Sequence, residues 1–133
     1  MKYLLDTNIC IYVINKKPEK VISKLRRFKP GDMGISIITL SELQKGVSKS
    51  RLKKKNQSAL DEFISVFTIL PFEQADAKVY GVIVADLESK GQIIGGNDLF
   101  IAAHALSRKL TLVTNNEKEF SRIDGLRIDN WAK

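Results

Sequence analysis

"KYLLDTNICIYVIN" occupies residues 2–15, and its character changes at Asp6. The residues before Asp6 form a short apolar run typical of a buried strand, and residues 8–15 read as a short helix. A strand that runs directly into a helix is the first half of a crossover unit. If the pattern repeats along the chain, the strands lie parallel in one sheet with helices on both faces.

The same alternation continues to the end of the chain. Further strands are expected at "GISII" (34–38), "TILPF" (68–72), "TLVT" (111–114) and "LRID" (126–129). Helices are expected at 18–28, from Thr39, at 52–67, at 73–89, from Asp98 and at 117–121. The sequence therefore predicts a single α/β domain over residues 1–133, with a mainly parallel sheet of about five strands sandwiched between helices.

Composition indicates a globular protein of the cytoplasm. The chain has 133 residues, of which 44% are hydrophobic and 28% are charged. No apolar run approaches the ~20 residues that span a bilayer, and Asp6 interrupts the first one, which argues against a signal peptide. The single cysteine, Cys10, excludes an internal disulfide or a cysteine zinc site. We expect no association with membranes.

Basic residues are unevenly distributed. The net charge is +7, and residues 16–29 contain seven basic side chains and one acidic one. Residues 45–55 contain six basic side chains and no acid: Lys45, Lys49, Arg51, Lys53, Lys54 and Lys55. Such patches bind polyanions by releasing counterions, although a solvated face that aids solubility has the same composition. We treat residues 45–55 as the candidate nucleic-acid-binding segment.

Asp6 directly follows the first expected strand. In open parallel sheets, functional groups gather where the strands end, which we call the carboxyl edge. The alternative is a helix cap, but Thr7 and Asn8 are also good caps and only one is needed. We therefore interpret Asp6 as a functional residue.

Glu42 allows two interpretations. "TLSE" (39–42) matches a capping box, with Thr39 as N-cap and Glu42 reaching back to it, which accounts for the acid without any chemistry. The same position, one turn into the helix after the second strand, also directs a carboxylate to the carboxyl edge. The residues alone leave both interpretations open.

Asp98 opens the helix in "GGNDLFIAAHA" (95–105). Asn97 is expected to cap that helix, which leaves Asp98 to face the carboxyl edge from the side of Ile101 and Ala102. His104 lies six residues further on, on a different face, and a structural role is favoured for it.

The segment "TLVTNNEKEF" (111–120) brings Thr114, Asn116, and Glu117 or Glu119 to the same edge. Acids that converge there repel one another unless their pKa values rise or a cation lies among them. Oxygen ligands favour Mg²⁺ or Mn²⁺ over zinc. Next to basic patches, such a site predicts hydrolysis of a nucleic-acid phosphodiester by a metal-activated water.

"LLDTNICIY", "ISIITLSEL", "GNDLFIAAHAL" and "TLVTNNEKEFSRIDGLRIDNW" resemble, in order and spacing, the PIN-domain toxins of the VapC type, from residue 2 to 131. The resemblance implies a PIN fold and a magnesium-dependent endoribonuclease, the toxin of a toxin–antitoxin pair. It implies structured RNA as substrate, chiefly tRNA and in some members initiator tRNA, so that cleavage inhibits translation. It also implies a VapB-type antitoxin, homodimers, and larger complexes of both proteins.

Carried over by position, the resemblance makes Asp6 and Asp98 the metal ligands and Glu42 the acid that helps shape the site. Thr114 matches a hydroxyl residue that steadies the carboxylates. Glu119 is preferred to Glu117 as a further acid because "EF" matches the subgroup pattern.

Asn116 departs from the family, which often has Asp there, and this weakens any second metal site. A non-catalytic RNA-binding PIN module therefore remains an alternative. A signalling receiver or an aspartyl phosphatase fits poorly, because the first needs a Lys after a late strand and the second an Asp at position 8, which is Asn8.

Overall fold

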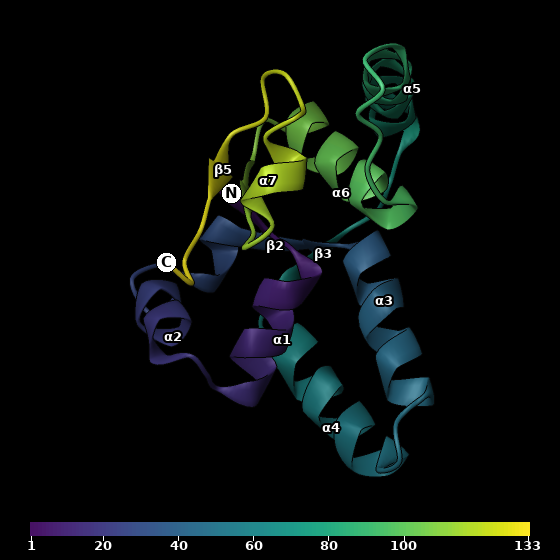
Figure 1. The fold of residues 1–133 in the computed structure, drawn as a ribbon. Coiled ribbons are helices and arrows are strands. Elements are labelled where there is room, and N and C mark those ends of the chain that lie inside the picture. The colour runs from purple at the N-terminus through teal and green to yellow at the C-terminus, as the bar shows by residue number, and fades with distance from the viewer.

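The centre of the fold is a five-stranded parallel sheet in the order β3-β2-β1-β4-β5 (Figure 1). The computed structural model describes residues 1–133. The strands are β1 (Tyr3–Leu5), β2 (Met33–Ser36), β3 (Thr68–Leu70), β4 (Thr111–Val113) and β5 (Ile128–Asp129). All four strand pairings are parallel, so the expected α/β class and sheet are confirmed.

The register of the central strands brings their last residues level. Leu5 of β1 pairs with Val113 of β4, and the Asp6 N–H extends the ladder by donating to Val113 O at 2.9 Å. The residues that follow, Asp6 and Thr114, therefore leave the sheet side by side. On the other side of β1, Leu4 pairs with Gly34, where an added Cβ would lie only 2.7 Å from Met1 Sδ.

Seven α-helices cover the sheet. They are α1 (Thr7–Asn15), α2 (Glu19–Leu25), α3 (Ile37–Ser48), α4 (Lys53–Ile64), α5 (Gln74–Ser89), α6 (Gly96–Ser107) and α7 (Glu117–Phe120), with a 3₁₀ turn at Pro30–Asp32. None of them combines the length and the apolar character that crossing a bilayer requires.

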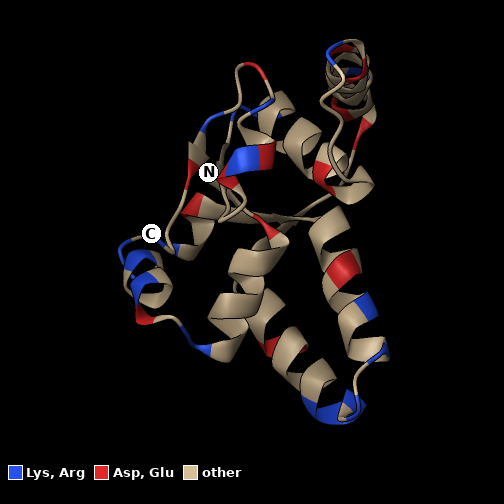
Figure 2. Cartoon of the chain, viewed as in Figure 1, with Lys and Arg blue, Asp and Glu red and all other residues tan.

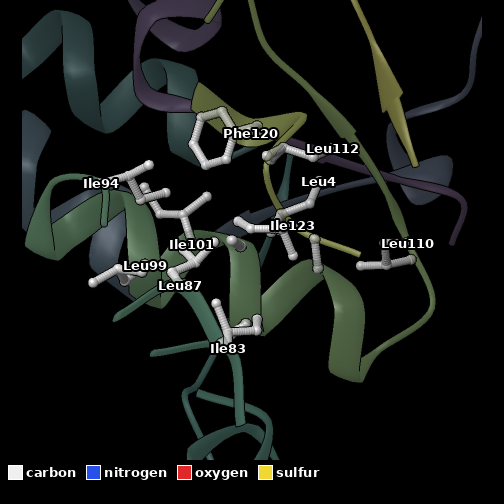
Figure 3. Close-up of a cluster of buried hydrophobic side chains, with 13 residues drawn as sticks. Leu4, Ile83, Leu87, Ile94, Leu99, Ile101, Leu110, Leu112, Phe120 and Ile123 are labelled. Atoms are coloured by element: carbon white, nitrogen blue, oxygen red, sulfur yellow. The ribbon is translucent and has the colours of Figure 1, made fainter. Parts of the chain in front are cut away.

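The two faces of the sheet bury two separate cores. Successive strand residues point to opposite faces, so Leu4 joins one core and Leu5 the other. Leu4 packs with α6 residues such as Ile101 and with Phe120 (Figure 3). Leu5 packs with residues of α1 and α4, including Leu60. The first core surrounds α6, which explains why that helix is apolar nearly all round.

Two aromatic residues continue the apolar spacing of the expected helices 52–67 and 18–28 but lie beyond the ends of the observed helices. Phe67 was expected to end a helix over 52–67, yet α4 ends at Ile64 because the chain must become extended for β3. Phe28 similarly follows the end of α2 and stacks on buried Trp131, with ring centroids 5.4 Å apart. Both side chains pack on the core, so their apolar spacing reports burial rather than helix.

A buried ion pair joins α5 to the end of α6. Asp76 is fully buried, and Arg108 donates to it twice, from Nε at 3.0 Å and from Nη2 at 2.9 Å. The Glu73 N–H donates a third bond at 2.8 Å. Burial alone would raise the pKa of Asp76, but these bonds outweigh it and lower the pKa to about 2.

This ion pair predicts the response of the fold to acid. Arg108→Ala should lower the free energy of unfolding at pH 7 by about 3 kcal/mol, because it leaves the Asp76 charge buried without its partner. The folded pKa of Asp76 lies below its ordinary 3.8, so the contribution is complete above about pH 4 and is lost as the pH falls towards 2. Urea unfolding of both proteins at pH 7 and pH 3 should show a smaller difference at pH 3. An equal difference at both values would contradict this account.

Candidate active site

Four acids lie at the carboxyl edge, and we call them the acidic site: Asp6, Glu42, Asp98 and Glu119. They follow β1 or lie in α3, α6 and α7, and Figure 2 shows acidic positions in these helices around the start of α1. The pKa of Asp98 is raised to about 6, first by burial and then by the charges of the other three acids. The structure therefore brings together the four carboxylates that the sequence predicts.

Asp6 is both a helix cap and a member of the acidic site. Its side chain is 4% exposed, and Oδ1 accepts from the Thr7 N–H at 2.8 Å as the N-cap of α1. Oδ2 accepts from Thr114 Oγ1 at 2.7 Å. Burial raises the pKa of Asp6 more than these two bonds lower it, and the charge of Glu42 raises it further. The capping role thus coexists with a carboxylate that lacks a compensating charge.

Thr114 fixes the orientation of Asp6. It is fully buried, and because its hydroxyl donates to Asp6, its oxygen is free to accept from the Asn116 N–H at 3.0 Å. Asn116 itself is the N-cap residue of α7 but makes no side-chain cap bond. The steadying contact predicted for Thr114 is thus present, and Asn116 contributes to it through its backbone.

The capping-box interpretation of Glu42 is wrong. Helix α3 begins at Ile37 rather than at Thr39, and its N-cap is Ser36, whose Oγ accepts from the Ile38 N–H at 3.1 Å. Thr39 is a buried residue of the first turn, and Glu42 lies one turn beyond it. Helix capping therefore does not account for Glu42.

Glu42 is held instead by neutral donors from two other helices. Its Oε1 accepts from Thr7 Oγ1 of α1 at 2.6 Å. Its Oε2 accepts from Asn97 Nδ2 of α6 at 3.3 Å. Glu42 thus connects the helices that carry Asp6 and Asp98.

Asn97 does not cap α6 as predicted. The helix begins two residues earlier than expected, at Gly96, and its N-cap is Gly95, which has no side chain to bond with. Asn97 is consequently free to contact Glu42, and Asp98 occupies the third position of the helix. A negative charge is favoured in that first turn because it lies close to the unpaired N–H groups.

The structure distinguishes Glu119 from Glu117. Glu117 accepts from Asn130 Nδ2 at 3.0 Å and lies 3.4 Å from Lys133 Nζ, so its carboxylate is engaged with the C-terminal segment. Glu119 lies close enough to Asp98 for its charge to raise the pKa of that group. Glu119, and not Glu117, therefore lies with the other acids.

No basic side chain neutralises the acidic site. The salt bridges of the chain all involve other acids, so each of these four lacks a Lys, Arg or His partner within 4.0 Å. No three Asp, Glu, His or Cys side chains are grouped closely enough to enclose a metal ion. Direct ligation is therefore limited to one or two carboxylates, which is how Mg²⁺ commonly binds proteins while keeping several waters. The oxygen donors of the site fit such an ion.

Sequence reasoning missed several polar residues around the acids. Thr7 and Asn97 hold Glu42, as described above. Asn115 donates to Tyr12 OH at 2.8 Å and accepts from Asn8 Nδ2 at 3.4 Å, which links the loop after β4 to helix α1. Each of these polar residues lies close in sequence to a predicted site residue, but their pairing across the fold leaves no signal in the sequence.

The basic segment 45–55 lies at the turn between α3 and α4, away from the sheet (Figure 2). Lys45 and Lys49 follow Glu42 by three and seven residues, so they share its face of α3. The remaining four, Arg51 and Lys53 to Lys55, lie in the turn and at the start of α4. One helix face therefore leads from the acidic site to this basic tip. The other basic segment, 16–29, surrounds α2.

Comparison with known proteins gives one family and several full-length relatives. The model of the PIN domain family matches residues 3–126. The chain is 51% identical over 134 residues to a Rickettsia felis protein named "Ribonuclease VapC2", covering 100% of both. It is 41% identical over 132 residues to a Shigella flexneri protein named "tRNA(fMet)-specific endonuclease VapC", covering 99% of both.

Solved structures agree with these relatives. A VapBC2 structure from Rickettsia felis bound to a promoter DNA fragment superposes with a TM-score of 0.91 at 48% identity, covering 98% of this chain and 99% of that one. A DNA-bound VapBC structure from Salmonella typhimurium gives 0.93 at 42% identity, covering 98% of both chains.

The charge of Asp98 predicts an unusual gain of stability. Without divalent cations, Asp98→Asn should raise the free energy of unfolding at pH 7.5 by about 1–3 kcal/mol, because it removes a charge that is disfavoured by burial and repelled by three other acids. The pKa of Asp98 lies near 6 instead of 3.8, so the wild type loses this stability as the pH rises between those values. Urea unfolding in EDTA at pH 4 and pH 7.5 measures the effect.

Magnesium should reverse the order of stability of the wild type and Asp98→Asn. Millimolar Mg²⁺ should stabilise the wild type and stabilise Asp98→Asn much less, because the ion binds the folded carboxylates. Glu88→Gln, at an exposed acid of α5, is the matched control and should respond to Mg²⁺ as the wild type does. A wild type that is indifferent to Mg²⁺ would contradict the assignment of a cation site.

Proposed function

Because this chain belongs to the PIN-domain family, and within it to the VapC type, we propose that it is a magnesium-dependent endoribonuclease that acts as the toxin of a toxin–antitoxin pair. The observation that carries the proposal is the group of four carboxylates without a basic partner. Such a site is adapted to a divalent cation and, through it, to a phosphodiester. The names of the relatives support ribonuclease activity.

The reaction is hydrolysis of a P–O bond of the RNA backbone by water. Asp6 and Asp98 would hold Mg²⁺, which supplies positive charge that polarises the phosphodiester. Thr114 and the Thr7 N–H keep both oxygens of Asp6 oriented. Glu42, fixed by its neutral donors, is positioned to orient the attacking water or accept its proton, and Glu119 completes the negative field.

The substrate we propose is structured RNA, and tRNA in particular. The Shigella flexneri relative is named for tRNA(fMet). That name supports tRNA as the substrate that we propose for this chain, and it extends the proposal to initiator tRNA. Cleavage of that molecule would inhibit translation. Lys45 and Lys49 are separated by four residues, or about 6 Å along the helix, which is close to the spacing of successive phosphates in a strand. We propose that they hold the backbone as it leaves the acidic site.

A VapB-type antitoxin is the proposed partner. The VapBC structures from Rickettsia felis and Salmonella typhimurium support such a complex. Carboxylates without an internal cation would also accommodate a basic side chain supplied by another protein. A homodimer and larger complexes with the antitoxin remain predictions from the family resemblance.

A non-catalytic RNA-binding module is the second candidate, and Asn116 favours it because an amide supplies no charge. Glu119 offsets this departure, since its carboxylate lies beside Asp98. The two candidates differ in one measurement: a binder retains RNA in Mg²⁺ without shortening it.

Cleavage by the acidic site is tested with Asp98→Asn and with a matched pair of glutamate variants, Glu119→Gln and Glu117→Gln. Asp98→Asn should lower the rate of RNA cleavage in Mg²⁺ by about 100-fold or more, because the cation loses a ligand. Glu119→Gln should lower the rate by a smaller factor. Sequencing of new RNA 5′ ends gives both the rate and the cleavage position, and EDTA should abolish the products.

Glu117→Gln is the control, since that carboxylate is engaged with Asn130 and Lys133. It should cleave within about twofold of the wild type. If Asp98→Asn cleaves as the wild type does, the proposed function is wrong.

The basic face of α3 is tested by the salt dependence of RNA binding. Lys45→Gln combined with Lys49→Gln should reduce the slope of log K against log salt by roughly 1.4–1.8, since two phosphate contacts are lost. The rate constant at saturating RNA should change little. Lys20→Gln combined with Arg27→Gln, in the other basic segment, removes the same charge and should leave the slope nearly unchanged. Equal slopes for the two double variants would contradict the assignment.

A further inference from the structure

His104 is the only histidine of the chain and is fully buried in α6. Its ring contacts two other elements. Nδ1 lies 2.8 Å from Ser36 Oγ, where β2 ends and α3 begins. Nε2 lies 3.1 Å from the carbonyl oxygen of Pro71, just after β3. A buried imidazole with both nitrogens engaged has a specific task in holding these elements.

The direction of each hydrogen bond follows from the partners. The Pro71 carbonyl can only accept, so Nε2 carries the ring hydrogen and donates it. Burial lowers the pKa of His104, which keeps the ring neutral and leaves Nδ1 as an acceptor. Ser36 Oγ accepts from the Ile38 N–H and therefore gives its own hydrogen to Nδ1. One directed series of bonds thus runs from the start of α3 through the ring to the end of β3.

The charged groups nearest the ring do not disturb this arrangement. Asp76 Oδ2 lies 3.8 Å from Nε2, beyond hydrogen-bond distance, and it is already bonded to Arg108 and to the Glu73 N–H. Arg108 Nη2 donates to the same Pro71 carbonyl at 2.8 Å. The acceptor of the Nε2 hydrogen is therefore itself fixed in place.

Helices α3 and α6 are consequently joined at two depths. At the surface, Asn97 of α6 donates to Glu42 of α3 at 3.3 Å, in a bond that water can compete for. Beneath it, His104 of α6 and Ser36, the N-cap of α3, form a shorter, wholly buried bond. Polar contacts in the low-dielectric interior are the stronger constraint. Of these two polar contacts, the buried one therefore constrains the relative placement of Glu42 and Asp98 more strongly.

We propose that His104 is a positioning residue for RNA cleavage: its bond with Ser36 sets how α3 presents Glu42 to Asp98. The ring does not touch the substrate. The inference rests on the proposed function and adds to it the buried contact that aligns two of its acids. A displacement of about 1 Å at a catalytic group can cost up to roughly 100-fold in rate, so a contact remote from the chemistry suffices.

Two substitutions of His104 separate its two bonds. In His104→Asn the amide oxygen takes the place of Nδ1 and still accepts from Ser36, while the bond to Pro71 is lost. In His104→Gln the amide nitrogen takes the place of Nε2 and still donates to Pro71, while Ser36 loses its acceptor. His104→Asn therefore keeps the bond at the start of α3, whereas His104→Gln keeps the bond at the end of β3.

We expect His104→Gln to lower kcat about 10- to 100-fold, with the KM for RNA within about twofold of the wild type. His104→Asn should retain most of kcat, although both variants lose thermal stability. Losses of kcat that are equal in the two variants, or that follow their melting temperatures, would overturn the inference.

Ser36→Ala tests the same bond from its other end. Combined with His104→Gln, it should lower kcat no further than Ser36→Ala alone, because both changes remove the Ser36–His104 bond and only Ser36→Ala also removes the N-cap bond to the Ile38 N–H. Multiplied losses would overturn the inference. In ¹⁵N NMR spectra of the wild-type ring at pH 7, Nδ1 should be unprotonated and Nε2 protonated, and the reverse tautomer would also overturn it.

The outcomes keep the two proposals apart. If Asp98→Asn is inactive while His104→Gln and His104→Asn cleave equally well, only the positioning role fails. If Asp98→Asn is active, the proposed function fails whatever the His104 variants do.

Discussion

Repulsion among four carboxylates is the constraint on which this structure depends. The parallel sheet places Asp6 at its carboxyl edge, and the helices that follow direct Glu42, Asp98 and Glu119 towards the same place. Burial of these carboxylates, and then the charges of their acidic neighbours, raise the pKa values of Asp6 and Asp98. A fold selected for stability alone would place a lysine or arginine among these acids. The absence of such a residue is consistent with the proposal that a cation from outside the chain binds there.

The acids are oriented by groups that do not neutralise them. Hydroxyl and amide donors from Thr7, Asn97 and Thr114 fix Glu42 and Asp6 without adding charge. These contacts set the geometry and leave the negative charge available to the proposed cation. Two cores on opposite faces of the sheet provide the stability that the acidic site lacks. The Arg108–Asp76 ion pair adds to it by joining α5 to the end of α6.

The sequence was most informative where local pattern and topology coincide. Apolar runs followed by polar residues identified the strands and placed Asp6 and Thr114 at one edge, because parallel strands all end on the same side. Asp98 was placed there by its position at the start of a helix. The start of α3 was misplaced, since Ser36 and Thr39 are both good caps. The choice between them depends on strand pairing: Ser36 is paired with Leu70, so the strand continues to Ser36 and the helix can begin only after it. Contacts such as that between Ser36 and His104, 68 residues apart, leave no local pattern.

The separation of acidic and basic groups follows from the same electrostatics. Lysines within the acidic site would form salt bridges with the carboxylates, displace the cation and remove the affinity for phosphate. Positive charge placed beyond Glu42, at Lys45 of α3 and at its C-cap Lys49, avoids this competition and would lie on the path proposed for the RNA strand. A divalent cation among four carboxylates leaves the site with a net negative charge, so it does not attract RNA by itself. In the proposed function the basic tip between α3 and α4 therefore complements the acidic site: holding the polyanion and binding the cation need opposite charges, and α3 connects the two regions.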